Sequence, residues 1–337
     1  MLSSQHEKEN QPIASFLGMK RKKGNVYIFL LLSSKMMDKN KAILLVLATA
    51  VISGFSIFIN KFGVEGIDAS VFTFLKNIIV AIFLFSLLFI FKEFNQLKKL
   101  TQKQWTQLAG IGLIGGSVPF VLFFEGLKLT SAASGALVHK TLFIYATIFA
   151  FLLLKEKLNK KIVLASILLL AGNTLLLKIE TIQFGMGELL VLGAALLWAL
   201  ENVISKHALK ELSGNMVAFG RMFFGSLFIL AYLAFVQKTS LLMELTIADV
   251  QWVIITSILL LLYVTTYYNG LKHISVSVAT SILLIGSPIT TMLSFLFLGT
   301  PMAFTQFAGI LLILAGAGIA VYLVELSEKR NPALSLA

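Results

Sequence analysis

Ten apolar segments of the chain are each long enough to cross a lipid bilayer. An α-helix rises 1.5 Å per residue, so about 20 residues span a hydrocarbon core of about 30 Å. The connections are short, so neighbouring helices run antiparallel, and no stretch alternates like a strand of a membrane β-barrel. The sequence predicts an all-α polytopic membrane protein with ten transmembrane helices. The segments lie near 42–60, 70–91, 106–128, 132–154, 161–178, 187–207, 216–236, 250–271, 275–298 and 304–324.

The composition indicates that lipid is the main solvent of the folded surface. Hydrophobic residues make up 58% of the chain, charged residues 13%, and the mean hydropathy is +0.90. In a typical soluble domain about a quarter of the residues are charged. The net charge of +12 comes largely from basic runs outside the apolar segments, such as 20–23 and 160–161. Such runs contact anionic lipid head groups, so the expected partner is the bilayer and not nucleic acid.

The residue inventory excludes several kinds of chemistry. The chain has no cysteine, which excludes disulfides and thiolate metal ligands. It also lacks a His-Glu-x-x-His pattern, a phosphate-binding Gly-rich loop and an acidic cluster for a metal. We therefore expect no metal, no cofactor and no ATP site. If such a chain moves solutes, the movement would be driven by a gradient or by exchange, which makes a proton or a counter-substrate a candidate partner.

The lysines between the segments predict the orientation. With a cytoplasmic N-terminus, the cytoplasmic connections hold eleven lysines and the external connections four. Basic residues favour the cytoplasmic side, so both termini of a multi-pass cell-membrane protein are expected there. Residues 1–40 are predicted to be a disordered cytoplasmic tail and residues 325–337 a C-terminal tail. Met36 or Met37 is an alternative translation start to Met1.

The apolar region contains an internal repeat. The segment 125–128 (EGLK) recurs at 269–272 (NGLK), an offset of 144 residues, and an offset of 145 relates Lys76 to Arg221. We predict a first five-helix repeat at 41–179 and a second at 184–324. Because five is odd, the second repeat enters the membrane from the opposite side. Inverted repeats of this kind exchange conformations in alternating access.

Several motifs resemble those of EamA-type members of the drug/metabolite transporter superfamily. They are the segment 184–199 (FGMGELLVLGAALLWA), the end of the fourth span at 152–158 (LLLKEKL), the Gly-Leu-Lys turns and Pro288 in the ninth span. The resemblance covers about residues 42–324. It implies ten spans in inverted repeats, with a central cavity lined by spans one to four and six to nine. It also implies movement of small metabolites, amino acids or drugs, commonly outward.

The chain departs from the family pattern at three places. Ile144 replaces the proline expected in span four, and the pair His139-Lys140 is unusual there. Thr300 stands where the second repeat could carry an equivalent of Glu156.

Lys140 lies near the middle of the membrane. It is about nine residues, or roughly 13 Å, into the fourth span, where an ionisable group costs about 2.5–3.5 kcal/mol on insertion scales. We expect it to meet an anionic substrate group or to form a structural ion pair. His139 points about 100° away around the helix. Its alternatives are proton coupling and a hydrogen bond to a neighbouring helix.

Other polar and aromatic residues are candidates for the cavity wall. Glu125 lies near the outer end of span three, where it could pair with Lys140, carry a proton, hold an amine, or be an interfacial acid. Trp198 and Glu201 share a helical face and could bind an amine by cation–π contact and charge, or be structural. The predicted substrate-cavity residues are Lys140, Glu125, Glu201, Trp198, Tyr267 and Asn269, with His139 and Glu125 as candidates for proton coupling.

Two further groups are given structural roles. Lys76 and Arg221 lie a turn or two into spans two and seven, and we expect them to act in gating or to be structural. Gly112 and Gly116 form a small-xxx-small pair, which favours close helix packing.

The sequence therefore predicts a secondary-active permease that moves a small metabolite, amino acid or drug-like compound by alternating access, in the direction of export. One alternative is a facilitator or exchanger for phosphorylated metabolites or sugar-nucleotides on the same fold. More distant alternatives are an intramembrane enzyme, for which no recognisable acid pair or Ser/His set exists, and a non-transporting scaffold. Homodimerisation is a further candidate interaction.

Overall fold

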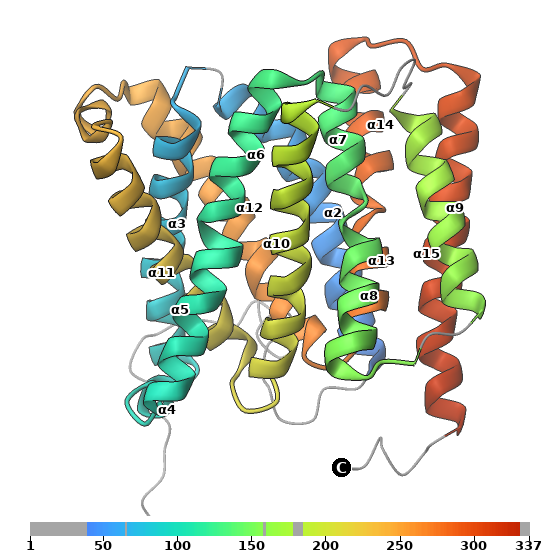
Figure 1. Ribbon diagram of the computed structural model, residues 1–337, viewed down its shortest axis with the longest axis horizontal. Helices are drawn as coiled ribbons and strands as arrows, with labels where there is room; N and C mark the ends of the chain where they lie inside the picture. Colours follow the sequence, from blue (N-terminus) through green and yellow to red (C-terminus); the bar gives the residue numbers. More distant parts are fainter. Residues whose placement is uncertain (1–38, 65, 158–159, 178–184, 331–337) are drawn as a thin grey trace, which may run out of the picture.

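The computed structural model describes residues 39–64, 66–157, 160–177 and 185–330, and these residues form a helical bundle without a β-strand (Figure 1). The predicted N-terminal tail lies outside this range except for its last two residues. The first repeat comprises α2 (Lys39–Gly63), α3 (Ala69–Ile90), α4 (Phe94–Leu97), α5 (Gln102–Gly116), α6 (Val118–Leu129), α7 (Ala132–Lys140), α8 (Leu142–Leu154) and α9 (Lys160–Leu176). The second comprises α10 (Met186–Ala208), α11 (Gly214–Phe235), the 3-10 helix η2 (Thr239–Met243), α12 (Ile247–Leu271), α13 (Val276–Leu283), α14 (Gly286–Leu298) and α15 (Phe304–Arg330).

The helices coincide with the ten predicted spans, and the chain is a multi-pass membrane protein. Nine stretches of the described helices are long and apolar enough to cross a membrane. The fifth predicted span forms α9, which has 17 residues and packs along α15 at one edge of the bundle (Figure 1). Helix α15 continues to Arg330, into the predicted C-terminal tail, because residues 325–330 (ELSEKR) are mostly good helix formers.

The connections alternate between two faces of the bundle. The upper face in Figure 1 carries the connection from α2 to α3, and the lower face carries α4 and the connection from α12 to α13. Side-chain caps begin several helices: Asp68 caps α3, Ser131 caps α7, and Ser275 caps α13. Each cap accepts a hydrogen bond from a backbone N–H group that the helix itself leaves free. Ser131 and Ser275 are repeat mates, so the two repeats start these helices in the same way.

Three spans are interrupted near their middle, a feature that the sequence prediction of continuous spans did not contain. Span three breaks at Ser117 between α5 and α6, span four at Thr141 between α7 and α8, and span nine at 284–285 between α13 and α14. Pro119 and Pro288 lie just after two of the breaks and cannot donate a backbone hydrogen bond. Span four breaks without a proline, and the Thr141 hydroxyl donates to the carbonyl of Val138 at 2.6 Å.

Glycines allow close approach between helices of opposite repeats. A Cβ added to Gly112 would lie 2.4 Å from the Cβ of Phe224, and one added to Gly116 would lie 2.9 Å from the Cα of Gly225. Helices α5 and α11 therefore pack backbone to backbone at this point. This confirms the predicted packing role of Gly112 and Gly116.

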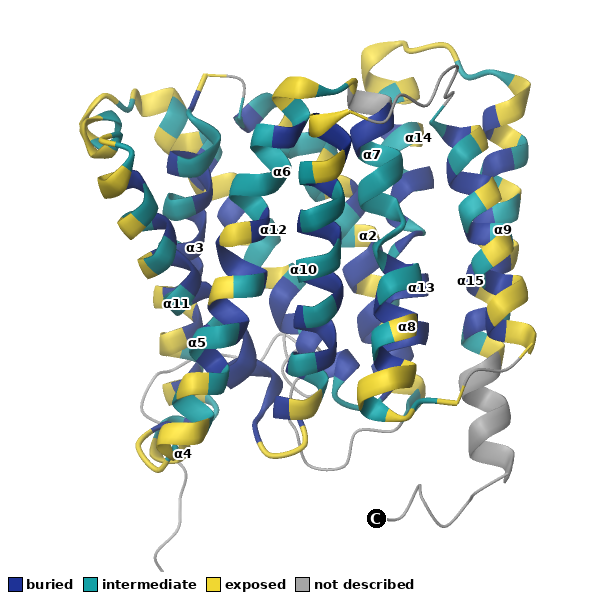
Figure 2. Cartoon of the chain, in the orientation of Figure 1, coloured by how far each residue is buried: buried dark blue, intermediate teal, exposed yellow. Residues whose placement is uncertain are grey.

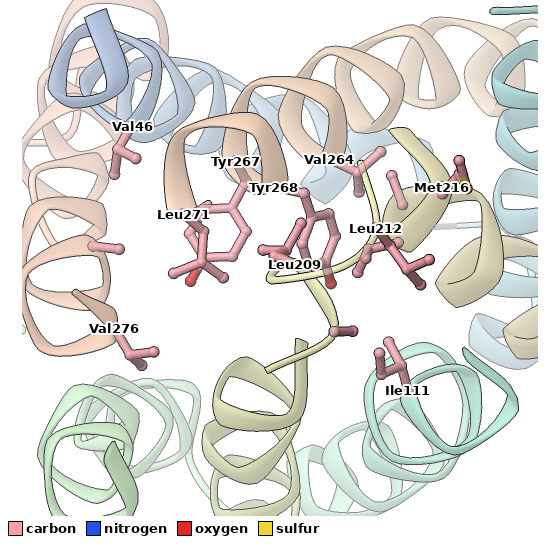
Figure 3. Close-up of a cluster of buried hydrophobic side chains, with 14 of the residues drawn as sticks. Val46, Ile111, Leu209, Leu212, Met216, Val264, Tyr267, Tyr268, Leu271 and Val276 are labelled. Atoms are coloured by element: carbon pink, nitrogen blue, oxygen red, sulfur yellow. The ribbon is translucent and has the colours of Figure 1, made fainter. Parts of the chain in front are cut away.

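One group of buried apolar side chains lies near the lower face. Figure 3 shows Tyr267, Tyr268 and Leu271 from α12 among Leu209 and Leu212 of the connection from α10 to α11. All five are at most 3% exposed. Exposed residues lie along the outer edges of helices such as α9 and α11, and buried ones line the central helices (Figure 2). The exposed apolar edges face lipid, which gives them an apolar solvent.

Candidate functional site

A cavity of about 480 Å³ lies in the middle of the bundle. Its lining residues come from α2, α3, α6, α7 and α8 of the first repeat and from α10, α11, α12 and α13 of the second. Spans five and ten, formed by α9 and α15, contribute no described residue to the lining. The family resemblance implied the same set of lining spans, one to four and six to nine.

The cavity extends to the upper face. On α2 the lining runs from Ser53 to Asn60 and on to Val64, which lies beyond the last residue of the helix. No described residue of the lower connections (91–101, 155–157, 209–213 and 272–275) contributes to it. At its lower end the Tyr267 hydroxyl donates to the side-chain oxygen of Asn202, and Tyr268 is fully buried below. The cavity thus reaches toward the upper face, and the Tyr267–Asn202 hydrogen bond and the buried Tyr268 separate it from the lower face.

The interruption of span three supplies hydrogen-bond acceptors to the cavity wall. In a regular helix the carbonyl of Gly115 would accept from the N–H of residue 119, but that residue is proline and has no N–H. The free Gly115 oxygen accepts from Trp198 Nε1 at 3.0 Å and from Arg221 Nη2 at 3.0 Å. The next carbonyl, of Gly116, accepts from Asn77 Nδ2 at 2.9 Å.

Glu201 and Arg221 are joined through one tyrosine hydroxyl. Tyr268 donates to Glu201 Oε1 at 2.6 Å and accepts from Arg221 Nη1 at 3.2 Å. Ser205 also donates to Glu201 Oε1, at 2.5 Å. The carboxylate and the guanidinium therefore lie in one hydrogen-bonded cluster, and each offsets the charge of the other. Arg221 Nε remains buried without a partner among the described residues.

Two lysines of the cavity have no carboxylate partner among the described residues. Lys76 is 9% exposed; its ammonium donates to Asn60 Oδ1 at 2.8 Å and lies 4.8 Å from the centre of the Phe72 ring. The ammonium of Lys140 has no hydrogen bond or ion pair within the described structure. Lys140 is the last residue of α7, where the partial negative charge of a helix C-terminus favours a cation.

Aromatic rings form one wall of the cavity. The ring of Trp198 lies 5.1 Å from that of Phe120, 5.7 Å from that of Phe123 and 5.1 Å from the imidazole of His139. Tyr263 and Tyr267 also line the cavity, and their rings stack at 5.8 Å. This pair shows the shared helical face expected for residues four apart.

The structure brings together most of the predicted site residues. Lys140, His139, Glu201, Trp198 and Tyr267 all line the cavity. Their roles in binding or in proton coupling stay predictions.

Lys76 and Arg221 were expected in gating or structural roles, and both line the cavity as well. The two residues occupy corresponding positions in the two repeats, Lys76 on α3 and Arg221 on α11. Their roles in gating or structure stay predictions.

Two predicted cavity residues lie elsewhere. Glu125 is 43% exposed at its side chain and pairs with Lys128 at 2.7 Å, so it is an interfacial acid outside the cavity wall. Its depth explains this position, because it lies only four residues from the end of α6. Asn269 lies below the cavity, where its Nδ2 donates to Asn215 Oδ1 at 3.0 Å. The expectation that both repeat mates face the cavity is therefore corrected.

The sequence reasoning missed Asn60 and Asn77, which also line the cavity. A signal for Asn60 was available, since it lies in the last turns of span one on the same face as Ser56, to which it donates at 3.0 Å. Polar residues four apart on an apolar span indicate a face turned to protein or water.

Comparisons with known proteins agree with this architecture. The profile of the EamA-like transporter family matches residues 40–178 and again residues 185–322. The uncharacterized transporter YyaM of Bacillus subtilis (strain 168) is 28% identical over 216 residues, which are 61% of this chain and 70% of that protein. The uncharacterized transporter YetK of the same organism is 24% identical over 85% of this chain and 86% of its own length.

A solved crystal structure has the same fold. It superposes with a TM-score of 0.70 at 19% sequence identity, covering 84% of this chain and 98% of that one.

Proposed function

The chain belongs to the EamA-like transporter family, and from this premise we propose that it is a secondary-active permease for a small metabolite, amino acid or drug-like compound. It works by alternating access, with the cavity between α2–α8 and α10–α13 as the substrate site. The observation that supports this proposal is a central cavity, lined by both repeats, that reaches toward one face and is separated from the other by buried residues. A pore would be open at both ends, and a scaffold has no use for charged side chains at this depth.

The orientation and direction belong to the same proposal. The lysine distribution supports cytoplasmic termini in the cell membrane, which makes the upper face external and the described state outward-open. Export is the direction supported by the family resemblance. The geometry itself serves either direction, since the coupled gradient decides which way substrate flows.

An exchanger of phosphorylated metabolites or sugar-nucleotides is the second candidate. It is favoured by three cations in the cavity lining, Lys76, Lys140 and Arg221, against one carboxylate, Glu201, among the described residues. Such an exchanger would require a counter-substrate on the opposite side, whereas a proton-coupled permease would respond to a pH gradient.

Transport by the purified chain in proteoliposomes tests the proposal. The vesicles are loaded with a mixture of amino acids, aromatic carboxylates, sugar phosphates and quaternary amines, and the released compounds are identified by mass spectrometry. We expect saturable release of at least one compound, lost in Lys140→Gln. Release no faster than from protein-free vesicles, with and without a pH gradient or external counter-substrate, would contradict a transport function.

A further inference from the structure

We propose that the substrate is an amphipathic organic anion, with a carboxylate or phosphate head group and an aromatic or aliphatic body. This inference rests on the proposed function, because it assigns the cavity as the transport site. The head group is held by the ammonium groups of Lys76 and Lys140. The body lies against the aromatic wall of the cavity.

The charge balance of the cavity carries the argument. Arg221 and Glu201 offset each other in the cluster built around the Tyr268 hydroxyl. Lys76 has only neutral partners, the Asn60 amide oxygen and the Phe72 ring. Lys140 has no described hydrogen-bond partner. The lining therefore holds two cationic groups for which the described structure provides no anion.

A counter-charge would stabilise the charged form of two lysines in such a place. Ionised groups are costly to hold in a low-dielectric interior unless a partner of opposite charge and suitable hydrogen bonds are present. A substrate that brings its own anionic group would supply both. A cationic amine would meet repulsion from the two lysines, and Oε1 of Glu201, the one carboxylate in the described lining, already accepts from Ser205 and Tyr268.

The remainder of the cavity matches an apolar body. The rings of Phe120 and Phe123 lie 5.1 Å and 5.7 Å from the ring of Trp198, which suits a planar or aliphatic group. A volume of about 480 Å³ lies within the range of small-molecule sites. Together these features favour a molecule with one charged end and one apolar end.

A thermal-shift comparison with matched probes tests the charge preference. The probes are 3-phenylpropionate, phenyl phosphate, phenethylamine and 2-phenylethanol, which share a ring and differ in head group. We expect at least one of the two acids to raise the unfolding temperature of the detergent-purified chain, and the amine and the alcohol to leave it unchanged. Equal stabilisation by the amine or the alcohol, or no stabilisation by either acid at millimolar concentration, overturns the proposal.

Lysine variants locate the head group. Lys76→Gln and Lys140→Gln should each weaken acid binding about tenfold or more, as expected for loss of a hydrogen bond to a charged group. Lys128→Gln is the matched control, because Lys128 is exposed and pairs with Glu125 on the surface. If Lys140→Gln and Lys76→Gln bind the acids as tightly as Lys128→Gln, the assigned head-group site is wrong. Transport of an amine instead would overturn the anion class and leave the permease function standing.

A second, independent feature is a hydrogen-bonded latch between the repeats at the lower face. The carboxylate of Glu156 accepts from Val276 N at 2.8 Å, from Ser277 N at 3.3 Å and from Ser277 Oγ at 2.8 Å. It caps the N-terminus of α13 from the end of α8, so it joins the two repeats at the closed end. An acid at a helix N-terminus is further favoured by the helix dipole.

The repeat mate of this latch lacks its chemistry. Lys155 and Gly299 are repeat mates and both end their helices in the left-handed conformation, at φ 58° and 63°. Thr300 therefore occupies the place of Glu156. The mates of Val276 and Ser277 are Ala132 and Ala133, which have no hydroxyl to donate. We infer that the Glu156 latch has no counterpart of the same chemistry at the upper face and biases the chain toward the described state.

A reporter cysteine tests the latch in the chain, which has no native cysteine. Ser56→Cys places a thiol in the cavity, and its labelling by an impermeant maleimide is measured from each side of the membrane. Glu156→Ala should increase labelling from the lower-face side several-fold, and Thr300→Glu combined with Ala133→Ser should reduce labelling from the upper-face side. Labelling from the lower-face side that is measurable but unchanged in Glu156→Ala, with unchanged labelling from the upper-face side in the double variant, would overturn the latch. A thiol that no variant exposes to the lower-face side would instead contradict alternating access.

Discussion

The carbonyl oxygen of Gly115 accepts a hydrogen bond from Arg221 Nη2 at 3.0 Å. This bond connects span three of the first repeat to span seven of the second. It exists because Pro119 leaves the carbonyl without a partner inside its own helix. The break in span three therefore places a cation of one repeat against the backbone of the other, at the wall of the cavity.

Substituting Gly115 tests this junction. A Cβ at Gly115 would lie 2.4 Å from Glu201 Cγ and 2.9 Å from Glu201 Cδ, so Gly115→Ala must displace the carboxylate from Tyr268. We expect destabilisation of about 1–3 kcal/mol, typical of overpacking, and loss of transport. Gly110→Ala is the control, because nothing lies within 4 Å of its added Cβ. Thermal unfolding in detergent should give a lower unfolding temperature for Gly115→Ala than for Gly110→Ala. Equal unfolding temperatures would show that the contact between Gly115 and Glu201 tolerates the added methyl group.

The two acids of the sequence prediction should now behave differently. Glu201 accepts two hydrogen bonds and is 1% exposed, so Glu201→Gln removes the charge that offsets Arg221. We expect a loss of about 1–3 kcal/mol in stability and little remaining transport. Glu125→Gln breaks an exposed pair and should change stability by less than about 1 kcal/mol, with transport intact. Loss of transport in Glu125→Gln would restore its assignment to the site.

The ion pair between Asp68 and Lys238 gives a pH-dependent prediction at the upper face. Their side chains meet at 2.6 Å. Burial opposes ionisation of Asp68, but hydrogen bonds from Lys238 and Ser70 and the charge of Lys238 outweigh it and lower the pKa of the carboxyl. The hydrogen bond to Asp68 raises the pKa of Lys238.

The direction of each pKa shift defines the pH range in which the ion pair stabilises the fold. Because folding lowers the pKa of Asp68, the ionised carboxylate stabilises the fold at pH values above its unfolded pKa of about 3.9. This stabilisation is lost as the pH falls through the folded pKa. Because folding raises the pKa of Lys238, the protonated lysine stabilises the fold at pH values below its unfolded pKa of about 10.4. This stabilisation is lost as the pH rises through the folded pKa. Asp68→Asn should therefore cost less than about 1 kcal/mol between these limits, since Lys238 is partly exposed.

A second variant separates charge from capping. Asp68 also accepts from Ser70 N at 2.9 Å as the cap of α3, a role that asparagine keeps and alanine loses. Asp68→Ala should cost about 1 kcal/mol more than Asp68→Asn, by thermal unfolding at neutral pH. Equal losses in the two variants would mean that the cap contributes nothing.

The sequence allowed the spans to be located closely because helix length and hydropathy are set by the bilayer itself. The repeat was visible for a similar reason: Lys76 and Arg221, or Ser131 and Ser275, keep corresponding places in both halves. Residues deep in a span, such as Lys140 and Glu201, were also assigned to the cavity, since lipid excludes charge at that depth.

The interruptions and the ends of spans were harder to predict. Thr141 breaks span four without a proline or glycine to signal it. Glu125 and Asn269 lie near span ends, where an ionisable or polar residue can reach the surface or a neighbouring helix as readily as a cavity. Which of these partners such a residue meets depends on packing between distant segments, which periodicity does not report.

Sidedness labelling tests the central claim most directly. Lys128 and Lys272 are repeat mates that lie at corresponding ends of spans three and eight, and the claim is that two inverted repeats enclose one alternating cavity. Single cysteines are placed at these positions and at Ser56, and an impermeant maleimide is applied to each side of sealed vesicles. We predict that position 128 is labelled only from outside, position 272 only from inside, and position 56 from outside in the resting state and from inside once the lower face opens. Labelling of positions 128 and 272 from the same side would contradict the account.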